Sequence, residues 1–202
     1  MTGLIDYGAG NLGSVMNALK RLSVPFRFVK GPEELLCANT PFQKIIFPGD
    51  GHFGTAMASL RQSGYAQVIC EWINADKPFL GICIGLQLLF ESSEEAPEVK
   101  GLSVIPGVVR RFSGRKVPQI GWNQTEAKPD SKIFRSLKSN SFFYYIHSYY
   151  SEPFDKTVCA AETEYHVRYC CAVERGALAA VQFHPEKSGE TGLALLKNWL
   201  EG

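Results

Sequence analysis

The segment Lys77-Pro-Phe-Leu-Gly-Ile-Cys-Ile-Gly-Leu-Gln-Leu-Leu-Phe90 decides the fold and points to the chemistry. Residues 79–82 form a short apolar run after a proline, which predicts a buried strand. Residues 84–90 are apolar on nearly every side, which predicts a buried helix. The pattern Gly81-Ile-Cys-Ile-Gly85 between them predicts a sharp turn, because glycine tolerates the crowded, strained backbone of such a connection.

Cys83 is therefore expected to project from the carboxyl end of a strand and to be a candidate nucleophile. A helix N-terminus carries partial positive charge, which favours thiolate over thiol. The backbone N–H of Ile84 would be free to stabilise an oxyanion. A buried structural cysteine is the alternative, since free cysteine is among the most buried residue types. The position between a strand and a helix favours the nucleophile.

The composition excludes several classes of function. A chain of 202 residues with 45% hydrophobic content can bury one sizeable core, so we expect a single domain over residues 1–202. The net charge of +1 gives no sign of a nucleic-acid or membrane-surface partner. The six cysteines lack CxxC spacing, which predicts no metal site and reduced thiols in a cytoplasm. We expect neither a signal peptide nor a membrane span.

Strand and helix patterns alternate up to the turn at Cys83. Strands are expected at 3–6, 25–29 and 44–47, and helices at 12–22, 54–60 and 65–75. This alternation predicts an α/β fold with a doubly wound parallel sheet, helices on both faces and a site at the carboxyl ends of the strands. Asp50 and Gly51, which follow the third strand in Pro48-Gly-Asp-Gly51, should share that rim with Cys83.

A dinucleotide site is disfavoured at the glycine-rich turn 7–11. Lys30 follows the next strand, where a dinucleotide site needs an acidic residue.

The pattern of predicted elements changes after Pro97. Short strand-like runs lie at 101–112, 117–126, 141–150, 157–161, 170–174 and 178–183, divided by Gly, Pro, Asn and Asp. They predict an antiparallel section joined to the parallel sheet, which makes the sheet mixed but mainly parallel. Leucines at helical spacing over 190–200 predict a final amphipathic helix.

A cysteine nucleophile needs a proton acceptor and a group that orients it. His184 follows an apolar run in Phe183-His-Pro-Glu186. Pro185 is expected to hold the backbone extended, which would place the His184 and Glu186 side chains side by side. The carboxylate could then fix the imidazole tautomer. A surface histidine beside a glutamate is the plain alternative, but the elbow at Cys83 favours a catalytic pair.

The other histidines are weaker candidates. His147, in Tyr144-Tyr-Ile-His-Ser-Tyr-Tyr150, is a second possible base without a neighbouring carboxylate, and we interpret it as substrate-binding or structural. His52 and His166 are expected to be ordinary loop or strand residues.

These motifs together resemble the triad (class I) glutamine amidotransferases, which implies a flavodoxin-like fold. Within that family the chain is most similar to the glutaminase subunits of imidazole glycerol phosphate synthases. The likeness covers nearly the whole chain and rests on motifs at residues 5–12, 48–54, 87–95, 120–123, 147–149 and 182–188.

The resemblance implies glutamine hydrolysis without a cofactor. Cys83 would attack the side-chain amide of glutamine, His184 would pass a proton to the departing ammonia, and Glu186 would orient His184. A glutamyl thioester would form and be hydrolysed. Backbone N–H groups of Ile84 and of the turn at Asp50 and Gly51 would hold the oxyanion.

The resemblance also implies which residues bind the amino acid end of glutamine: Gln87, Glu95, His147, Ser148 and Tyr149. Glu95 could pair with the α-ammonium group. The alternative is that Glu91, Glu94 and Glu95 merely form a solvated end to the helix after Cys83.

A partner is implied as well, a cyclase subunit with a (β/α)8 barrel that receives the ammonia in a heterodimer serving histidine biosynthesis. Asn11, Trp122 and Lys187 would lie on the docking face, with core packing as the alternative for Trp122. Rival readings are a glutaminase subunit for another synthase, a regulatory subunit with a decayed site, and another cysteine hydrolase. The regulatory subunit is disfavoured because the triad and Gln87 are all present, and the cysteine hydrolase is disfavoured because Gln87 and Glu95 are both present.

The chain departs from the family pattern at two positions. Asp50 stands where an aliphatic residue is usual, so its side chain should point away from the oxyanion while its backbone serves. Gln119 stands where histidine is frequent, with little effect expected on hydrolysis and some on docking.

Overall fold

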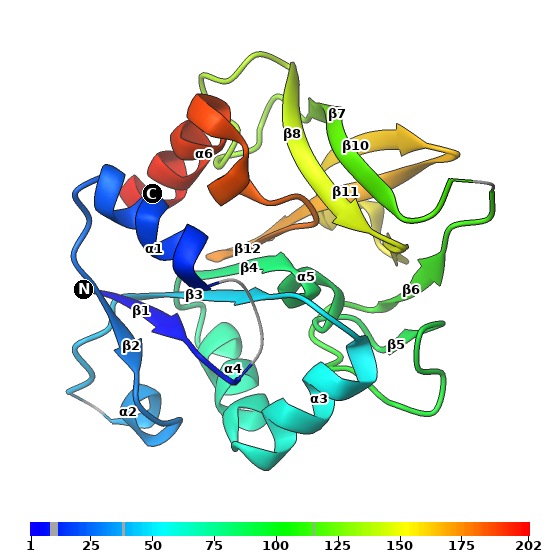
Figure 1. Cartoon of the computed structure of the whole chain (residues 1–202). Helices are drawn as coiled ribbons and strands as arrows, with labels where there is room; N and C mark the ends of the chain where they lie inside the picture. The colour runs from blue at the N-terminus through cyan, green and yellow to red at the C-terminus, as the bar shows by residue number, and fades with distance from the viewer. Residues whose placement is uncertain (9–11, 38, 115) are drawn as a thin grey trace.

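The computed structural model describes residues 1–8, 12–37, 39–114 and 116–202. Its centre is a sheet whose first five strands run parallel, as Figure 1 shows. Their spatial order is β2 (Phe26–Val29), β1 (Thr2–Ile5), β3 (Lys44–Gly49), β4 (Phe79–Cys83) and β12 (Leu178–Val181). Parallel strands end at one edge of a sheet, so this order brings the segments after β3, β4 and β12 together.

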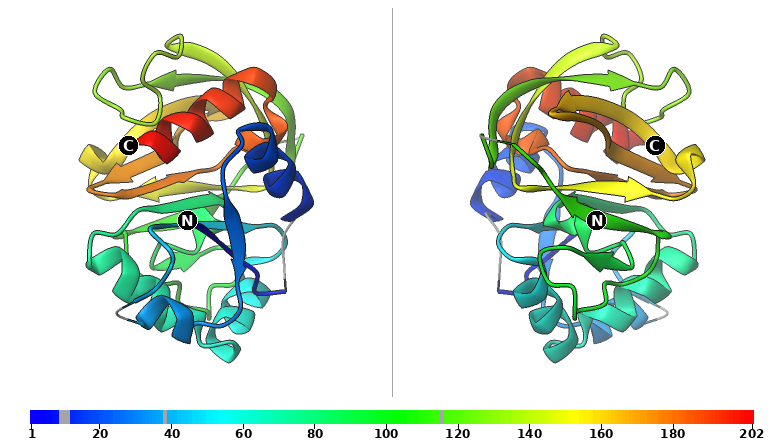
Figure 2. Two further views of the ribbon diagram at one scale, coloured as in Figure 1. Left: turned by 90° about the vertical axis from the view of Figure 1, so that its left-hand side faces the viewer. Right: turned by 90° about the vertical axis from the view of Figure 1, so that its right-hand side faces the viewer.

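Helices cover both faces of the parallel strands (Figures 1 and 2). One face carries α1 (Leu12–Arg21) and α6 (Gly189–Glu201), and the other carries α2 (Glu33–Leu36), α3 (Phe53–Gln62) and α4 (Tyr65–Asn74). The strand side chains alternate between the two layers. In β3, Ile46 packs with the α1–α6 side, whereas Ile45 and Phe47 pack with the α2–α4 side. The doubly wound prediction is confirmed.

The second half of the chain adds antiparallel strands to this sheet. Strand β12 pairs parallel with β4 and antiparallel with β11, so it joins the two sections. The antiparallel strands are β6 (Gly107–Arg111), β7 (Gln119–Ala127), β8 (Asn140–His147), β9 (Tyr149–Pro153), β10 (Cys159–Tyr165) and β11 (Val167–Arg175). The short β5 (Ser92–Ser93) pairs parallel with β6. The mixed, mainly parallel architecture with an antiparallel section is thus confirmed.

The helix after Cys83 is shorter than predicted. It spans α5 (Ile84–Gln87), not residues 84–90. The carbonyl groups of the next turn are taken by the loop that follows: Leu102 N–H donates to Leu88 O at 2.8 Å and Ser103 N–H to Phe90 O at 3.3 Å. The helix ends because these carbonyls serve tertiary contacts that residue periodicity cannot indicate.

Several predicted strands also have different bounds. The run 101–112 forms a strand only at β6, because residues 102–105 bond to the turn after α5. The run 141–150 is two strands, because the chain leaves its partner β7 at His147 and pairs with β6 from Tyr149. The run 157–161 begins as a 3-10 turn, η1 (Lys156–Val158), before β10.

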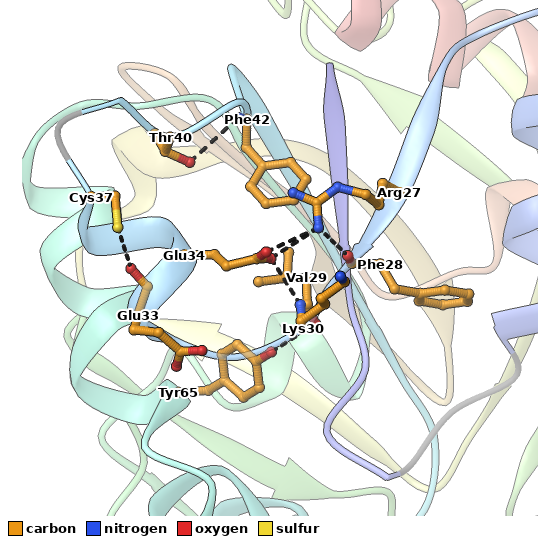
Figure 3. A network of polar contacts seen from close by, with 10 residues as sticks. All are labelled: Arg27, Phe28, Val29, Lys30, Glu33, Glu34, Cys37, Thr40, Phe42 and Tyr65. Atoms are coloured by element: carbon orange, nitrogen blue, oxygen red, sulfur yellow. Dashed lines mark hydrogen bonds and ion pairs between the residues drawn. The ribbon is translucent and has the colours of Figure 1, made fainter.

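A polar network secures the edge strand β2 (Figure 3). Arg27 Nη1 donates to Glu34 Oε1 at 3.0 Å and its guanidinium lies over the Phe42 ring. The Lys30 N–H donates to Glu34 Oε2 at 2.9 Å. This backbone bond and then the Arg27 bond lower the pKa of Glu34. Tyr65 Oη donates to Val29 O at 3.0 Å, which ties β2 to α4.

Candidate active site

Cys83 sits on a strained turn between β4 and α5. Its φ of 57° and ψ of −107° lie in a region that side-chain-bearing residues rarely adopt. A Cβ on Gly85 would lie 2.3 Å from Phe47 O, and one on Gly81 would lie 2.7 Å from Gly85 O. Both positions therefore require glycine, and the predicted strand–turn–helix at Cys83 is confirmed.

Three strand ends converge on Cys83. The sheet register pairs Cys83 with Gly49 of β3 and Ile82 with Val181 of β12. They border a cavity of about 320 Å³, within the usual size of small-molecule sites. Its lining holds every residue predicted for the oxyanion site and for substrate binding, together with two of the triad: Asp50, Gly51, Cys83, Ile84, Gln87, Glu95, His147, Ser148, Tyr149 and His184. Pro118, Ile146 and Lys187 complete the lining.

His184 and Glu186 form a buried pair. His184 Nδ1 lies 2.7 Å from Glu186 Oε1, and their side chains are 5% and 2% exposed. The contact was predicted, but the reason given for it was wrong. Residues Pro185–Lys187 form a 3-10 turn, η2, rather than an extended segment, and Lys187 N–H closes the turn on His184 O at 3.0 Å.

The turn that carries His184 is anchored to β8. His184 N–H donates to Tyr144 O at 2.9 Å. Ser188 Oγ donates to His184 O at 2.6 Å and accepts from Tyr144 N–H at 3.0 Å. These bonds fix the backbone from which the imidazole projects.

The surroundings of the His184 imidazole favour its protonated, cationic form. Burial is the largest single influence and lowers its pKa, but hydrogen bonding to Cys83 and Glu186 and their negative charges outweigh it and raise the pKa to about 10. Within the described ranges Nε2 makes no hydrogen bond of regular geometry, so its contact with the Cys83 sulfur is a loose one. Glu186 holds Nδ1, which leaves Nε2 for proton transfer.

The turn predicted to bind the oxyanion follows β3. Gly51 has a φ of +95°, and a Cβ on Gly49 would lie 2.1 Å from Ile84 Cγ2 and 2.3 Å from Tyr7 Oη. Asp50 between them is exposed. The buried Tyr7 hydroxyl, which was not singled out from the sequence, has no partner among the described residues. Burial first, then the charges of Asp50 and Cys83, raise its pKa.

Hydrogen bonds connect Gln87, at the cavity, through Gln182 to Cys83. Gln87 Nε2 donates to Tyr149 O at 3.1 Å and to Gln182 Oε1 at 3.0 Å. Gln182 Nε2 lies 3.7 Å from Cys83 Sγ. Gln182 was missed in the sequence, although a fully buried amide inside the apolar run 178–183 is itself a signal of a special role.

His147 is a structural member of the site. It is buried, Nδ1 donates to Tyr149 O at 2.6 Å, and the Tyr169 hydroxyl lies 3.1 Å from Nε2. Burial foremost lowers its pKa to about 4, so it is neutral near pH 7. The same Tyr169 hydroxyl bonds Gln119 Oε1 at 2.9 Å. Gln119 is thus buried behind His147 and not on the surface.

Three glutamates after α5 accept backbone N–H groups. Glu95 Oε2 accepts from Phe53 at the start of α3 at 2.6 Å, Glu91 Oε2 from Gly107 at 3.0 Å and Glu94 Oε2 from Arg111 at 2.8 Å. The alternative of a merely solvated helix end is wrong.

His52 is likewise more than a loop residue, since its Nδ1 caps α3 by accepting from Gly54 N–H at 3.1 Å. His166 connects β10 to β11 at a φ of 60°, which matches the expectation of an ordinary loop residue.

The predicted docking residues have different settings. Trp122 is 57% exposed on β7, so the alternative of core packing is wrong. Lys187 lies at the cavity. Asn11 lies outside the described residues.

The described ranges lack both a metal-binding cluster and a membrane-spanning helix. They contain no cluster of three or more His, Cys, Asp or Glu side chains placed to hold a metal ion. They also contain no helix with the length and apolar character needed to cross a membrane.

Comparison with known proteins decides the family. The family model for glutamine amidotransferase class-I matches residues 3–201. The chain belongs to this family. Among curated relatives, this amidotransferase is 45% identical to imidazole glycerol phosphate synthase subunit HisH of Moorella thermoacetica, over 98% of the chain and 93% of that protein. It is 46% identical to the chloroplastic imidazole glycerol phosphate synthase hisHF of Arabidopsis thaliana, over 98% of the chain.

The amidotransferase spans 33% of the length of the Arabidopsis protein. Among solved structures, one titled as a glutamine amidotransferase superposes with a TM-score of 0.77 at 21% identity, covering 99% of this chain and 97% of the other. That likeness supports the fold alone.

Proposed function

We propose that this class I amidotransferase is the glutaminase subunit of an imidazole glycerol phosphate synthase. The observation that carries the proposal is the convergence of Cys83 with the buried His184–Glu186 pair on one cavity. The HisH relatives, 40–46% identical over nearly the whole chain, support the assignment to histidine biosynthesis. We further propose that residues 1–202 act as one domain in a cytoplasm, where the six free thiols would stay reduced.

The proposed reaction begins with attack of the Cys83 sulfur on the carbonyl carbon of the glutamine side-chain amide. The developing oxyanion accepts N–H bonds from Ile84 and from the turn at Asp50 and Gly51. The His184 imidazolium gives its Nε2 proton to the amide nitrogen, the C–N bond breaks, and ammonia leaves. Neutral His184 then takes a proton from water, the resulting hydroxide attacks the thioester carbonyl, and glutamate departs as the thiolate reforms. Glu186 holds the imidazole in one tautomer throughout.

The amino acid end of glutamine would be bound on the side of the cavity opposite His184. Gln87 donates its two side-chain N–H groups to Tyr149 O and Gln182 Oε1. Its own Oε1 is then left to accept a hydrogen bond from an α-ammonium group. Glu95 adds negative charge at the same lining. His147 supports this binding indirectly, because it fixes the Tyr149 carbonyl and is neutral near pH 7.

The partner would dock on the outer face of β7 and β8. Strand pairing places Ile120 opposite Ile146 and Trp122 opposite Tyr144. The exposed apolar residues of this face are Ile120, Trp122, Phe142 and Ile146. Ile146 and Lys187 also line the cavity, so the face adjoins the place where ammonia would be released. We propose that a cyclase subunit with a (β/α)8 barrel covers this face in a heterodimer, with Trp122 as an anchor.

Glutamate release from glutamine tests the function. The purified chain would be assayed alone and with a histidine-pathway cyclase subunit plus its nucleotide ligand. We expect activity that rises sharply with the cyclase and disappears in the Cys83→Ala variant. Activity indifferent to the cyclase would leave a glutaminase but contradict the partner, and would favour the alternative of a subunit for another synthase. No activity in any mixture would contradict the proposed glutaminase.

A further inference from the structure

We propose that Gln182 is a further catalytic residue, whose side-chain amide donates an N–H to the Cys83 sulfur and stabilises it as the attacking thiolate. The inference rests on the proposed function, because it takes Cys83 as the nucleophile. Gln182 Nε2 lies 3.7 Å from Cys83 Sγ, within the range of an N–H···S hydrogen bond. The residue is 0% exposed and does not line the cavity, so it touches the reacting atom without touching substrate.

Counting donors fixes the direction of this amide. The carbonyl of Tyr149 can only accept, so the group of Gln87 that faces it at 3.1 Å must be the NH₂. The second N–H of that NH₂ then points to Gln182 at 3.0 Å, which requires an oxygen there. Gln182 therefore turns its own NH₂ toward the sulfur. A flipped Gln182 would set two donors against each other and put an oxygen against the thiolate, which burial makes costly.

The Gln182 amide gives the sulfur a hydrogen-bond donor that lasts through the whole reaction, which the His184–Glu186 pair does not. The imidazolium must surrender its proton during the reaction, and the favourable charge beside the sulfur goes with it. A neutral amide keeps its N–H in every step, so it stabilises the thiolate both before attack and as the leaving group of thioester hydrolysis. Gln87 is a positioning residue in this scheme, since it acts on the sulfur only through Gln182.

Other titratable groups also face Cys83 and must be held constant. Tyr7 after β1, Asp50 after β3, Tyr169 of β11 and His184 after β12 each interact with its charge or lie beside it. Substitutions at Gln182 leave all four in place.

The test uses two variants of the full chain. Gln182→Met removes the donor with similar shape, and Gln182→Glu keeps the oxygen that accepts from Gln87 while replacing the donor by an acceptor. Alkylation of Cys83 by iodoacetamide, read by mass spectrometry of its peptide, is followed against pH. The midpoint of reactivity should rise by about one pH unit for Gln182→Met and further for Gln182→Glu. Ser131→Ala, which removes a buried hydroxyl bonded to Glu174, should leave the midpoint unchanged.

Hydrolysis with the synthase partner present gives the second readout. We expect kcat to fall about 10- to 100-fold with KM within about threefold, because the lost bond is to the sulfur and not to glutamine. Folded variants with a wild-type pH midpoint would overturn the proposal. If neither variant folds, the Gln182 side-chain amide signal in the wild-type NMR spectrum must move when Cys83 is alkylated, and a static signal would overturn it. Hydrolysis that survives in Cys83→Ala would instead contradict the proposed function, while the alkylation midpoints would still report on Gln182.

Discussion

His184 Nδ1 lies 2.7 Å from Glu186 Oε1 inside a single 3-10 turn, with both side chains almost fully buried. Glu186 Oε2 has no partner in the part of the chain that the structure describes. Among the described residues the carboxylate therefore bonds one imidazole alone, whose cationic form it stabilises.

Glu186→Gln should reduce kcat for glutamine hydrolysis by at least about 100-fold, because the neutral amide no longer fixes the tautomer or stabilises the imidazolium. The measurement is glutamate release at saturating glutamine with the synthase partner present. The matched control is Glu190→Gln, an exposed carboxylate that pairs with Arg21. Equal activity of Glu186→Gln and wild type would contradict the orienting role.

His147 should make the protein less stable in mild acid. An ordinary histidine has a pKa near 6.5, whereas burial lowers that of His147 to about 4. As pH falls below 6.5 the unfolded chain binds a proton there that the folded chain does not, so stability is lost between pH 6.5 and 4. Between pH 7 and 5 this residue should remove about 2 kcal/mol of unfolding free energy. Urea unfolding of His147→Gln should show a shallower decline, and an identical decline would refute the effect.

His184 should act in the opposite direction. Its pKa is raised to about 10, so its contribution to stability is complete below pH 6.5 and is lost as pH rises toward 10. The unfolding free energy of the wild type should therefore be lower at pH 9.5 than at pH 7. This difference should be smaller in His184→Gln. A wild-type decline that persists unchanged in the variant would show that other groups cause it.

Asp50 should lower the glutaminase activity of the chain without its partner. Its carboxylate is exposed in the turn proposed to bind an oxyanion, and like charges about 4 Å apart in water repel by about 1 kcal/mol. Asp50→Val should raise partner-free glutamate release about fivefold. Asp130→Asn, an exposed carboxylate at a separate cavity, serves as the control. A drop in activity in Asp50→Val would mean that the carboxylate assists the turn instead.

Trp122→Ala should weaken binding of the synthase partner about 30-fold without changing the melting temperature, since Trp122 is exposed and central to the apolar face of β7 and β8. Phe154→Ala removes a similarly exposed aromatic residue from outside that face and should bind normally. Titration calorimetry of the two variants decides the point. Equal affinities of the two variants for the partner would show that the interface lies outside the face of β7 and β8.

The sequence predicted the elbow at Cys83 because its determinants are local. Glycine is required at positions 81 and 85, within two residues of Cys83, and this pattern is visible in the chain. The bounds of α5 and of the later strands were predicted less well, because they depend on which distant carbonyl groups accept from residues 102–105 and on where β8 exchanges one partner strand for another.

The same distinction holds for the site. The His184–Glu186 contact could be predicted from neighbouring residues, although the turn that makes it could not. The bonds from Gln87 to Gln182 and from Glu95 to the start of α3 join residues 95 and 42 positions apart. Only the packed structure shows such orientations, and Gln182 was therefore missed.

Labelling with an electrophilic glutamine analogue, such as its diazoketone, tests the central claim most directly. The account predicts one covalent adduct, located on Cys83 by peptide mass spectrometry, which excess glutamine prevents and Glu186→Gln slows. An adduct on another cysteine, or labelling of Cys83 that glutamine does not prevent, would contradict the assignment of Cys83 as the nucleophile of a glutamine site.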